Sequence, residues 1–241
     1  MRLLSKGESN SKQAKTLPGY NPLVFNLSLA ASDSAVAGRT VCGHESPACR
    51  EFCLHLTGMG SMVFDSRVAK TRRLWNDRAS FIADVTADLR SAERQGVKKS
   101  RPVVVRLDAF SDLPWENWVD MSDFKIQFYD YTKNPRRMHR FLDGKMPANY
   151  HLTFSRSEIN DSEVKQVLRR GGNVAVVFDR SIPSRWGGRD VIDGTKHDFR
   201  YLDPTGVVVG LKFKEAKTHK GAGAQSRAAC ISNGFIAPVS A

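Results

Sequence analysis

Short apolar runs separated by polar segments make up most of the chain. Each run is rich in β-branched or aromatic side chains, which is typical of buried strands. Several contain hardly any polar residue, as expected of parallel strands that are buried on both faces. The predicted strands cover residues 23–31, 103–107, 126–131, 150–154, 174–178 and 207–211.

Amphipathic stretches between these runs predict helices. Val63, Val68 and Leu74 are spaced for one buried helical face, and Gly96 is placed to end the next helix. A third helix is expected over residues 161–170, before Gly171 and Gly172. The second helix is indicated by Phe81, Ile82, Val85 and Leu89. The alternation of strands and helices predicts an α/β fold.

Polar residues recur directly after the predicted strands. In a (β/α) barrel such positions meet at one face, where active sites are built. We therefore expect a TIM-barrel-like or partial (β/α) barrel with a cysteine-bearing loop after the first strand, although a doubly wound sheet remains an alternative. The expected organisation is a flexible basic arm (1–20), one α/β domain (21–215) and a C-terminal extension (216–241).

The chain carries a formal net charge of +12 in 241 residues. An excess of Lys and Arg usually serves a polyanion, because phosphate contacts release condensed counterions. The charge therefore predicts a nucleic-acid partner, against the alternative that it only aids solubility. The basic residues cluster at Lys70, Arg72 and Arg73, at Lys133, Arg136, Arg137 and Arg140, and at Lys212, Lys214, Lys217 and Lys220.

Three of the four cysteines lie on one polar segment with the spacing C-x6-C-x3-C. Cys42, Cys49 and Cys53 offer thiolates for an iron–sulfur cluster or, alternatively, zinc. A closed zinc site would need a fourth ligand from His44, His55 or Cys230. The competing interpretation is that the three are reduced, buried cysteines that act as small apolar residues.

Two polar patches supply candidate catalytic and substrate-binding residues. Paired carboxylates in a cleft can divide acid and base roles, although Asp112 could instead cap a helix. Tyrosines beside cations could stack a base and hold phosphates, and Arg156 suits a bidentate anion contact. The candidate catalytic residues are Asp108, Asp112 and Asp130. The candidate substrate-binding residues are Tyr131, Lys133, Arg136, Arg137, Ser155 and Arg156.

Several sequence blocks resemble the gene product 88-like family of bacteriophage genomes. They are VCGHESPACREFCLHLTGMG, RLDAFSDLPWE, QFYDYTK, ANYHLTFSRSEIND, NVAVVF and FRYLDPTGVVVGLK, and they span about residues 20–214. The resemblance implies a phage protein without assigning it an activity.

The cysteine loop also resembles, in layout, that of the radical S-adenosylmethionine enzymes. Those enzymes use the spacing C-x3-C-x2-C and a Gly-Gly-Glu segment, and this sequence has neither, so S-adenosylmethionine is not supported as a cofactor. A resemblance to base-exchanging transglycosylases would instead make Asp108 a nucleophile and the metal a structural zinc.

These features together predict a phage-encoded, metal-containing barrel that modifies a nucleic-acid base or a nucleotide. The alternative is a non-catalytic nucleic-acid-binding accessory protein whose metal staples a loop. No window approaches the ~20 apolar residues of a membrane-spanning helix. The N-terminus lacks the apolar segment of a secretory signal, so we expect the cytoplasm of the host cell.

Overall fold

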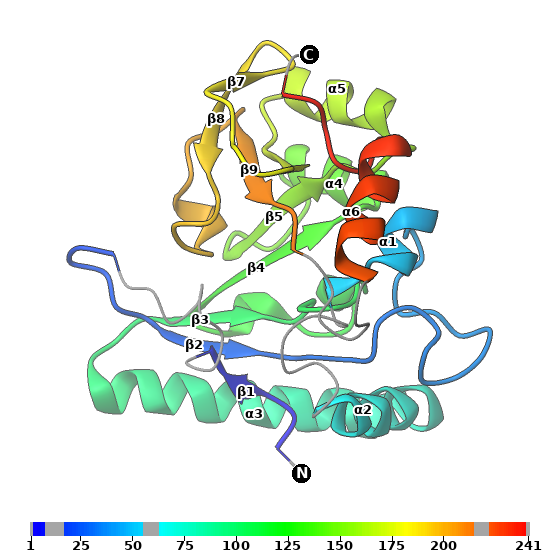
Figure 1. The fold of residues 1–241 in the computed structure, drawn as a ribbon. Helices are drawn as coiled ribbons and strands as arrows, with labels where there is room; N and C mark the ends of the chain where they lie inside the picture. The colour runs from blue at the N-terminus through cyan, green and yellow to red at the C-terminus, as the bar shows by residue number, and fades with distance from the viewer. Residues whose placement is uncertain (1, 8–16, 55–62, 215–221, 240–241) are drawn as a thin grey trace.

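One open sheet with helices packed on it forms the fold (Figure 1). The computed structural model describes residues 2–7, 17–54, 63–214 and 222–239. Its strands are β1 (Ser5–Lys6), β2 (Leu23–Asn26), β3 (Val103–Arg106), β4 (Ile126–Thr132), β5 (Tyr150–Ser155), β6 (Val174–Phe178), β7 (Arg185–Trp186), β8 (Arg189–Asp193) and β9 (Val208–Lys212). Its helices are α1 (Pro47–Glu51), α2 (Phe64–Asn76), α3 (Arg78–Lys99), α4 (Pro135–Leu142), α5 (Asp161–Arg169) and α6 (Ala222–Ser232). Short 3-10 turns include η3 (Trp115–Asn117), η4 (Met121–Asp123) and η5 (Arg200–Leu202).

The described strands lie in the order β1-β2-β3-β4-β5-β6-β9-β8-β7. From β2 to β6 the neighbours are parallel and follow one another along the chain, and β9 lies parallel beside β6. The antiparallel β1 covers one edge, and β8 with the antiparallel β7 covers the other. The expected α/β class is confirmed, but a closed TIM barrel is wrong, because edge strands occupy the places where the sheet would have to close.

The six strands predicted from apolar runs are all present, with shifted ends. The first is shorter than expected: β2 ends at Asn26, and residues 27–31 continue as a loop. Helices α2, α3 and α5 match the three amphipathic stretches. The structure adds α4, which begins after Asn134, whose side chain accepts from the backbone N–H groups of Arg136 and Arg137.

Alternation along the strands divides the central sheet into two faces. One face packs its apolar side chains against the helices, and we call it the helical face. Its buried cluster includes Phe25, Val103, Val105, Ile126, Phe128, Leu152 and Phe154 from strands, and Leu74, Phe81, Val85, Met138, Val164 and Val167 from helices. The alternate positions form the opposite side, which we call the polar face, with Arg106, Tyr129, Tyr131, Lys133 and Ser155 at the carboxyl ends of β3–β5.

Gly96 does not end its helix, contrary to expectation. The helix α3 continues to Lys99 and ends where Ser100 adopts the left-handed conformation at φ 50°. A Cβ at Gly96 would lie 2.4 Å from Cγ2 of Val103, and 3.0 Å from the carbonyl oxygen of Arg101. Glycine is therefore needed there because α3 passes close to the start of β3.

Both ends of the described chain contribute to the packed structure. Leu3 and Leu4 are buried in the core beside β1. Near the other end, the backbone N–H of Ala237 donates to the carbonyl of Val177 at 2.8 Å. Within the described residues, no helix is both long and apolar enough to cross a membrane.

Candidate functional site

The loop of residues 27–54 leaves the carboxyl end of β2 and carries three cysteines. The thiol of Cys42 donates to the carbonyl of Phe110 at 3.5 Å and accepts from the backbone N–H of Ser32 at 3.5 Å. Cys49 lies within α1, and Cys53 follows that helix. All three are reduced cysteines of intermediate exposure.

Glu158 fastens this loop to the end of β5. Its carboxylate accepts from Oγ of Ser46 at 2.7 Å and from the backbone N–H of Ala48 at 2.9 Å. Ser46 in turn caps α1 by accepting from the N–H of Cys49 at 3.2 Å. The cysteine loop therefore lies at the carboxyl edge of the sheet, where the strand-end residues also gather.

The three cysteines are close enough to affect one another electrostatically. Burial raises the pKa of the Cys42 thiol well above its usual range, and charge on Cys53 or Cys49 would raise it further. Burial alone would lower the pKa of Lys133, but Cys49 beside its ammonium group raises it overall. Among the described residues, no three His, Cys, Asp or Glu side chains are already grouped to hold a metal ion.

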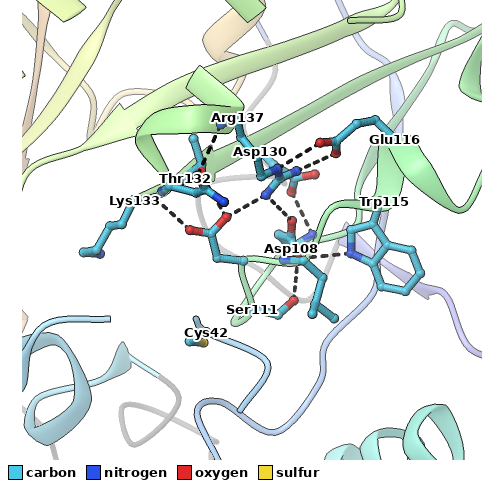
Figure 2. Close-up of polar contacts among 12 residues, drawn as sticks. Cys42, Asp108, Ser111, Trp115, Glu116, Asp130, Thr132, Lys133 and Arg137 are labelled. Carbon is cyan, nitrogen blue, oxygen red and sulfur yellow. Dashed lines mark hydrogen bonds and ion pairs between the residues drawn. The ribbon is translucent and has the colours of Figure 1, made fainter. Parts of the chain in front are cut away.

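Asp108, an expected catalytic residue, lies on the helical face and is 2% exposed. Its Oδ1 accepts from Oγ of Ser111 at 2.6 Å, from N of Leu113 at 3.0 Å and from Nε1 of Trp115 at 3.0 Å (Figure 2). Its Oδ2 lies 3.4 Å from Nη1 of Arg137. Both oxygens are thus engaged by protein groups, which is the arrangement of a structural carboxylate.

Arg137, an expected substrate-binding residue, is only 3% exposed and lies at the centre of a buried network. Its Nη1 donates to Asp112 at 2.6 Å, and its Nε and Nη2 donate to Glu116 at 3.2 and 2.9 Å. Burial alone would lower its pKa, but Tyr150 and the surrounding carboxylates raise it well above the usual value. Asp112 also accepts from the backbone N–H of Lys133 at 2.8 Å, so the network fixes the end of β4.

Asp130 is fully buried in the same network. Its Oδ1 accepts from the backbone N–H of Asp108 at 2.8 Å, and its Oδ2 accepts from the hydroxyl of Tyr150 at 3.1 Å. Burial raises the pKa of Asp130 well above its usual range, and Asp108 adds to the shift. Burial also raises the pKa of Asp108 to about 6. Burial of the two acids in one layer therefore disfavours their ionised forms.

A second cluster lies on the polar face and is organised by Asp198, on the segment after β8. Its carboxylate accepts from the hydroxyls of Tyr129 at 2.9 Å and Tyr131 at 3.4 Å, and from Nη1 of Arg106 at 3.3 Å. The guanidinium of Arg106 lies 4.8 Å from the ring centre of Tyr131. The Tyr131 side chain is half-buried and that of Arg106 is 17% exposed, so the pair is reachable from outside.

Lys133 extends this cluster toward the cysteine loop. Its Nζ lies 3.3 Å from Oγ of Ser155, as the register of β4 beside β5 requires. Figure 2 shows its side chain pointing away from Arg137, although its backbone N–H belongs to the buried network. The expected site is therefore divided: Tyr131, Lys133 and Ser155 share the polar face, whereas the three aspartates and Arg137 do not.

Arg156 and Arg136 lie apart from both clusters. Nη1 of Arg156 donates to the carbonyls of Gly234 at 2.7 Å and Phe235 at 3.2 Å, and its Nε pairs with Asp161 at 2.9 Å. These contacts hold the C-terminal segment on the sheet, and Arg156 is only 7% exposed. Arg136 is exposed on α4.

The basic clusters read from the sequence are only partly available to a ligand. Lys70 donates to the carbonyl of Leu3 at 2.9 Å, and Arg72 donates to that of Ala35 at 3.1 Å. Arg73 pairs with Asp84 at 2.7 Å. Several cations of the first cluster are therefore used to join segments of the fold, and Lys217 and Lys220 lie outside the described residues.

Arg106 and Asp198 escaped the sequence analysis. Arg106 gave a signal, because it is the one charged residue at the end of the apolar run VVVR. The alternation in IQFYDYTK also separates Tyr129, Tyr131 and Lys133 from Asp130. Asp198 gave no such signal, since its partners lie 67 to 92 positions away in sequence.

The fold and these clusters define an α/β protein with a three-cysteine loop at the carboxyl edge of an open, mostly parallel sheet. Residues 2–236 match the family model described as Gene product 88. The chain therefore belongs to the gene product 88 family, as the resemblance indicated. No curated protein and no solved structure matches it.

Proposed function

We propose that this chain is a metal-containing protein that acts on nucleic acid, with Cys42, Cys49 and Cys53 as its metal ligands. The observation that carries the proposal is that one loop at the carboxyl edge of the sheet supplies all three thiols, with Cys49 beside Lys133. Ligand sites of α/β sheets lie at this edge. The sequential order of the parallel strands supports the finer description of the fold as a partial (β/α) barrel.

The donor set fits a metal in its chemistry. Three thiolates are ligands for an iron–sulfur cluster or for zinc. Metal binding often completes a site that is not preformed, so we infer that the loop contracts around the metal. We favour the iron–sulfur cluster, with zinc as the alternative. When bound, a cluster would supply electron transfer or an open iron position at this edge.

We assign no ligand role to Cys230, which is buried on α6. Burial raises its pKa to about 12, and the charges of Glu51 and Glu158 add to the shift. His44 is exposed on the loop, and His55 lies outside the described residues. A set of three ligands leaves one coordination position for substrate, which favours an enzyme over a purely structural metal.

Nucleic acid as the substrate is supported by charge and by the polar face. The chain carries a net charge of +12. On the polar face, the guanidinium of Arg106 lies 4.8 Å from the ring centre of Tyr131, and Lys133 follows Tyr131 on the same side of the sheet. This arrangement suits phosphates and a stacked base. We infer base or nucleotide modification as the reaction class. The alternative is a non-catalytic accessory protein that binds nucleic acid and uses the metal to staple the loop.

Anaerobic purification with an absorption spectrum and metal analysis tests the metal. We expect iron and a broad absorbance near ~400 nm that is usual for iron–sulfur ligation. Replacing Cys42, Cys49 and Cys53 with Ala should remove the metal, whereas Cys230→Ala should retain it. A wild-type protein without metal, or a triple variant that keeps it, would contradict the proposal.

Salt dependence tests the partner. If phosphates are neutralised by Lys and Arg, the logarithm of the affinity for a single-stranded oligonucleotide should fall linearly with the logarithm of salt concentration. The measurement is fluorescence anisotropy between ~50 and ~300 mM salt. If the oligonucleotide does not bind even at the lowest salt concentration, the net positive charge serves solubility and not nucleic-acid binding.

A further inference from the structure

We propose that the polar face binds a single nucleotide unit, with its phosphate at Lys133 and Ser155 and its base against the Arg106–Tyr131 pair. This inference rests on the proposed function and names the place and the unit of recognition. It also assigns Asp198 a positioning role.

The phosphate position follows from the ends of β4 and β5. Lys133 and Ser155 are neighbours across the two strands, with Nζ 3.3 Å from Oγ. An ammonium and a hydroxyl at this distance can both donate to one phosphate oxygen. Both residues are half-buried, so a bound phosphate would be partly shielded from water and held more firmly than at the open surface.

The base position follows from the alternation along β4. Tyr131 and Lys133 are two residues apart on one face, which separates them by roughly 7 Å along the strand. The separation between a base and its own 5′-phosphate is of the same order. The aromatic ring of Tyr131 can stack on any base, and the guanidinium of Arg106 can add a cation–π contact.

Asp198 fixes the orientation of this pair before a ligand arrives. Its carboxylate holds the hydroxyls of Tyr129 and Tyr131 and Nη1 of Arg106 at once. The Nε of Arg106 is buried without a hydrogen bond and lies 3.9 Å from Oδ1 of Asp130. Asp198 and Asp130 therefore both balance the charge of Arg106.

The charge at Lys133 favours an anion. Arg106 is paired with Asp198, and Arg200 is paired with Asp203. Asp112, whose charge also acts on Lys133, is paired with Arg137 at 2.6 Å. The ammonium group of Lys133 therefore favours a phosphate ester over a neutral nucleoside. Because Cys49 lies beside Lys133, a nucleotide held here would lie next to the proposed metal site.

Calorimetric titration with 5′-dAMP, adenosine, inorganic phosphate and a dT12 oligonucleotide tests the assignment. Lys133→Met should weaken dAMP and phosphate binding at least tenfold and leave adenosine binding unchanged. Tyr131→Leu should weaken dAMP and adenosine about tenfold, whereas Tyr131→Phe keeps the ring and should stay within threefold. The control Lys99→Met removes an equal charge at the far end of α3 and should change nothing.

Asp198→Asn tests the positioning role. It should weaken adenosine and dAMP binding several-fold while inorganic phosphate still binds as in the wild type. A purely structural role would instead lower all affinities together with thermal stability. Circular dichroism melts of every variant separate these two results.

The outcomes distinguish the sources of the ligand and the two proposals. If Lys133→Met and Tyr131→Leu weaken the binding of dT12 alone, the result supports a nucleotide within a strand as the ligand. If they weaken the binding of dAMP, the result supports a free nucleotide. If neither variant changes the binding of any probe, or if no probe binds at all, the inference is overturned. Metal content measured on the same samples reports separately on the cysteine loop, because nucleotide binding by metal-free protein would contradict only the metal assignment.

Discussion

The helical face and the polar face carry different polar clusters within the same few residues of β4. The side chains of Asp130 and Thr132 lie on the helical face, in a network whose carboxylates accept hydrogen bonds from protein donors. Tyr131 follows Asp130, and Lys133 follows Thr132. Their side chains lie on the polar face and are half-buried. At this end of β4 the side of the sheet, rather than residue type or nearness in sequence, separates the fully buried groups from the half-buried ones.

The two clusters also differ in how their charges are balanced. Arg137 contacts Asp108, Asp112 and Glu116, and it has no open side for a ligand. Lys133 contacts Ser155 and lies beside Cys49. A buried charge with several ion-pair partners is costly to disturb, whereas a half-buried cation such as Lys133 depends less on its partners.

The largest expected effect is on the stability of the helical face. Arg137→Met removes the cation that Asp108, Asp112 and Glu116 share and should lower the free energy of unfolding by about 3–5 kcal/mol. Lys133→Met, the matched change on the polar face, should lower it by about 1 kcal/mol or less. Urea denaturation measures both, and equal losses would break the comparison.

The pH dependence of stability should come from the helical face as well. Asp108 has a pKa near 6 in the folded protein against 3.8 in a free chain. Its contribution is therefore complete below pH ~4 and is lost as the pH rises to ~6, by about 3 kcal/mol in all. Burial also raises the pKa of Asp130, so Asp130 should add to the loss of stability as the pH rises.

Asp108→Asn removes this titration. The variant should be less stable near pH 4, because the Asn amide places an N–H donor against the guanidinium of Arg137. Its free energy of unfolding should also vary less between pH 4 and 6. Urea unfolding curves at several pH values measure the slope. An unchanged slope would show that Asp108 does not carry a raised pKa.

A smaller effect is expected where the cysteine loop meets the sheet. Glu158→Gln replaces a charged acceptor of two hydrogen bonds and should cost about 1 kcal/mol of stability. If the loop binds metal, the variant should also lose it to a chelator about tenfold faster. Glu163→Gln, in the first turn of α5, is the control and should match the wild type in chelator assays.

Much of the fold could be predicted from the sequence, because strand periodicity and helix spacing are local signals. The six main strands and the helices α2, α3 and α5 were predicted in this way. The closed barrel was not correct, since it depends on what pairs with the free edges of β2 and β9. Those partners, β1 and β8, are too short or too polar to stand out in the sequence.

The candidate site could be predicted only in part, for a similar reason. The cysteines and Lys133 were found by type and position, and their gathering at one edge follows from parallel strands. The burial of Asp108 depends on Trp115 and Arg137, whose contacts with it are tertiary. Asp198 comes from a segment far along the chain, so its role required the structure.

The most direct test of this account is anomalous diffraction from anaerobically grown crystals, recorded above and below the iron and zinc absorption edges. The account predicts one anomalous peak, iron by preference, at the sulfurs of Cys42, Cys49 and Cys53, with metal–sulfur distances of about 2.3 Å. It also predicts that Lys133 borders that peak and that Asp108 does not contact it. An anomalous peak among the aspartates of the helical face would contradict it. So would the absence of a peak at the cysteines in protein that was purified and crystallised without oxygen.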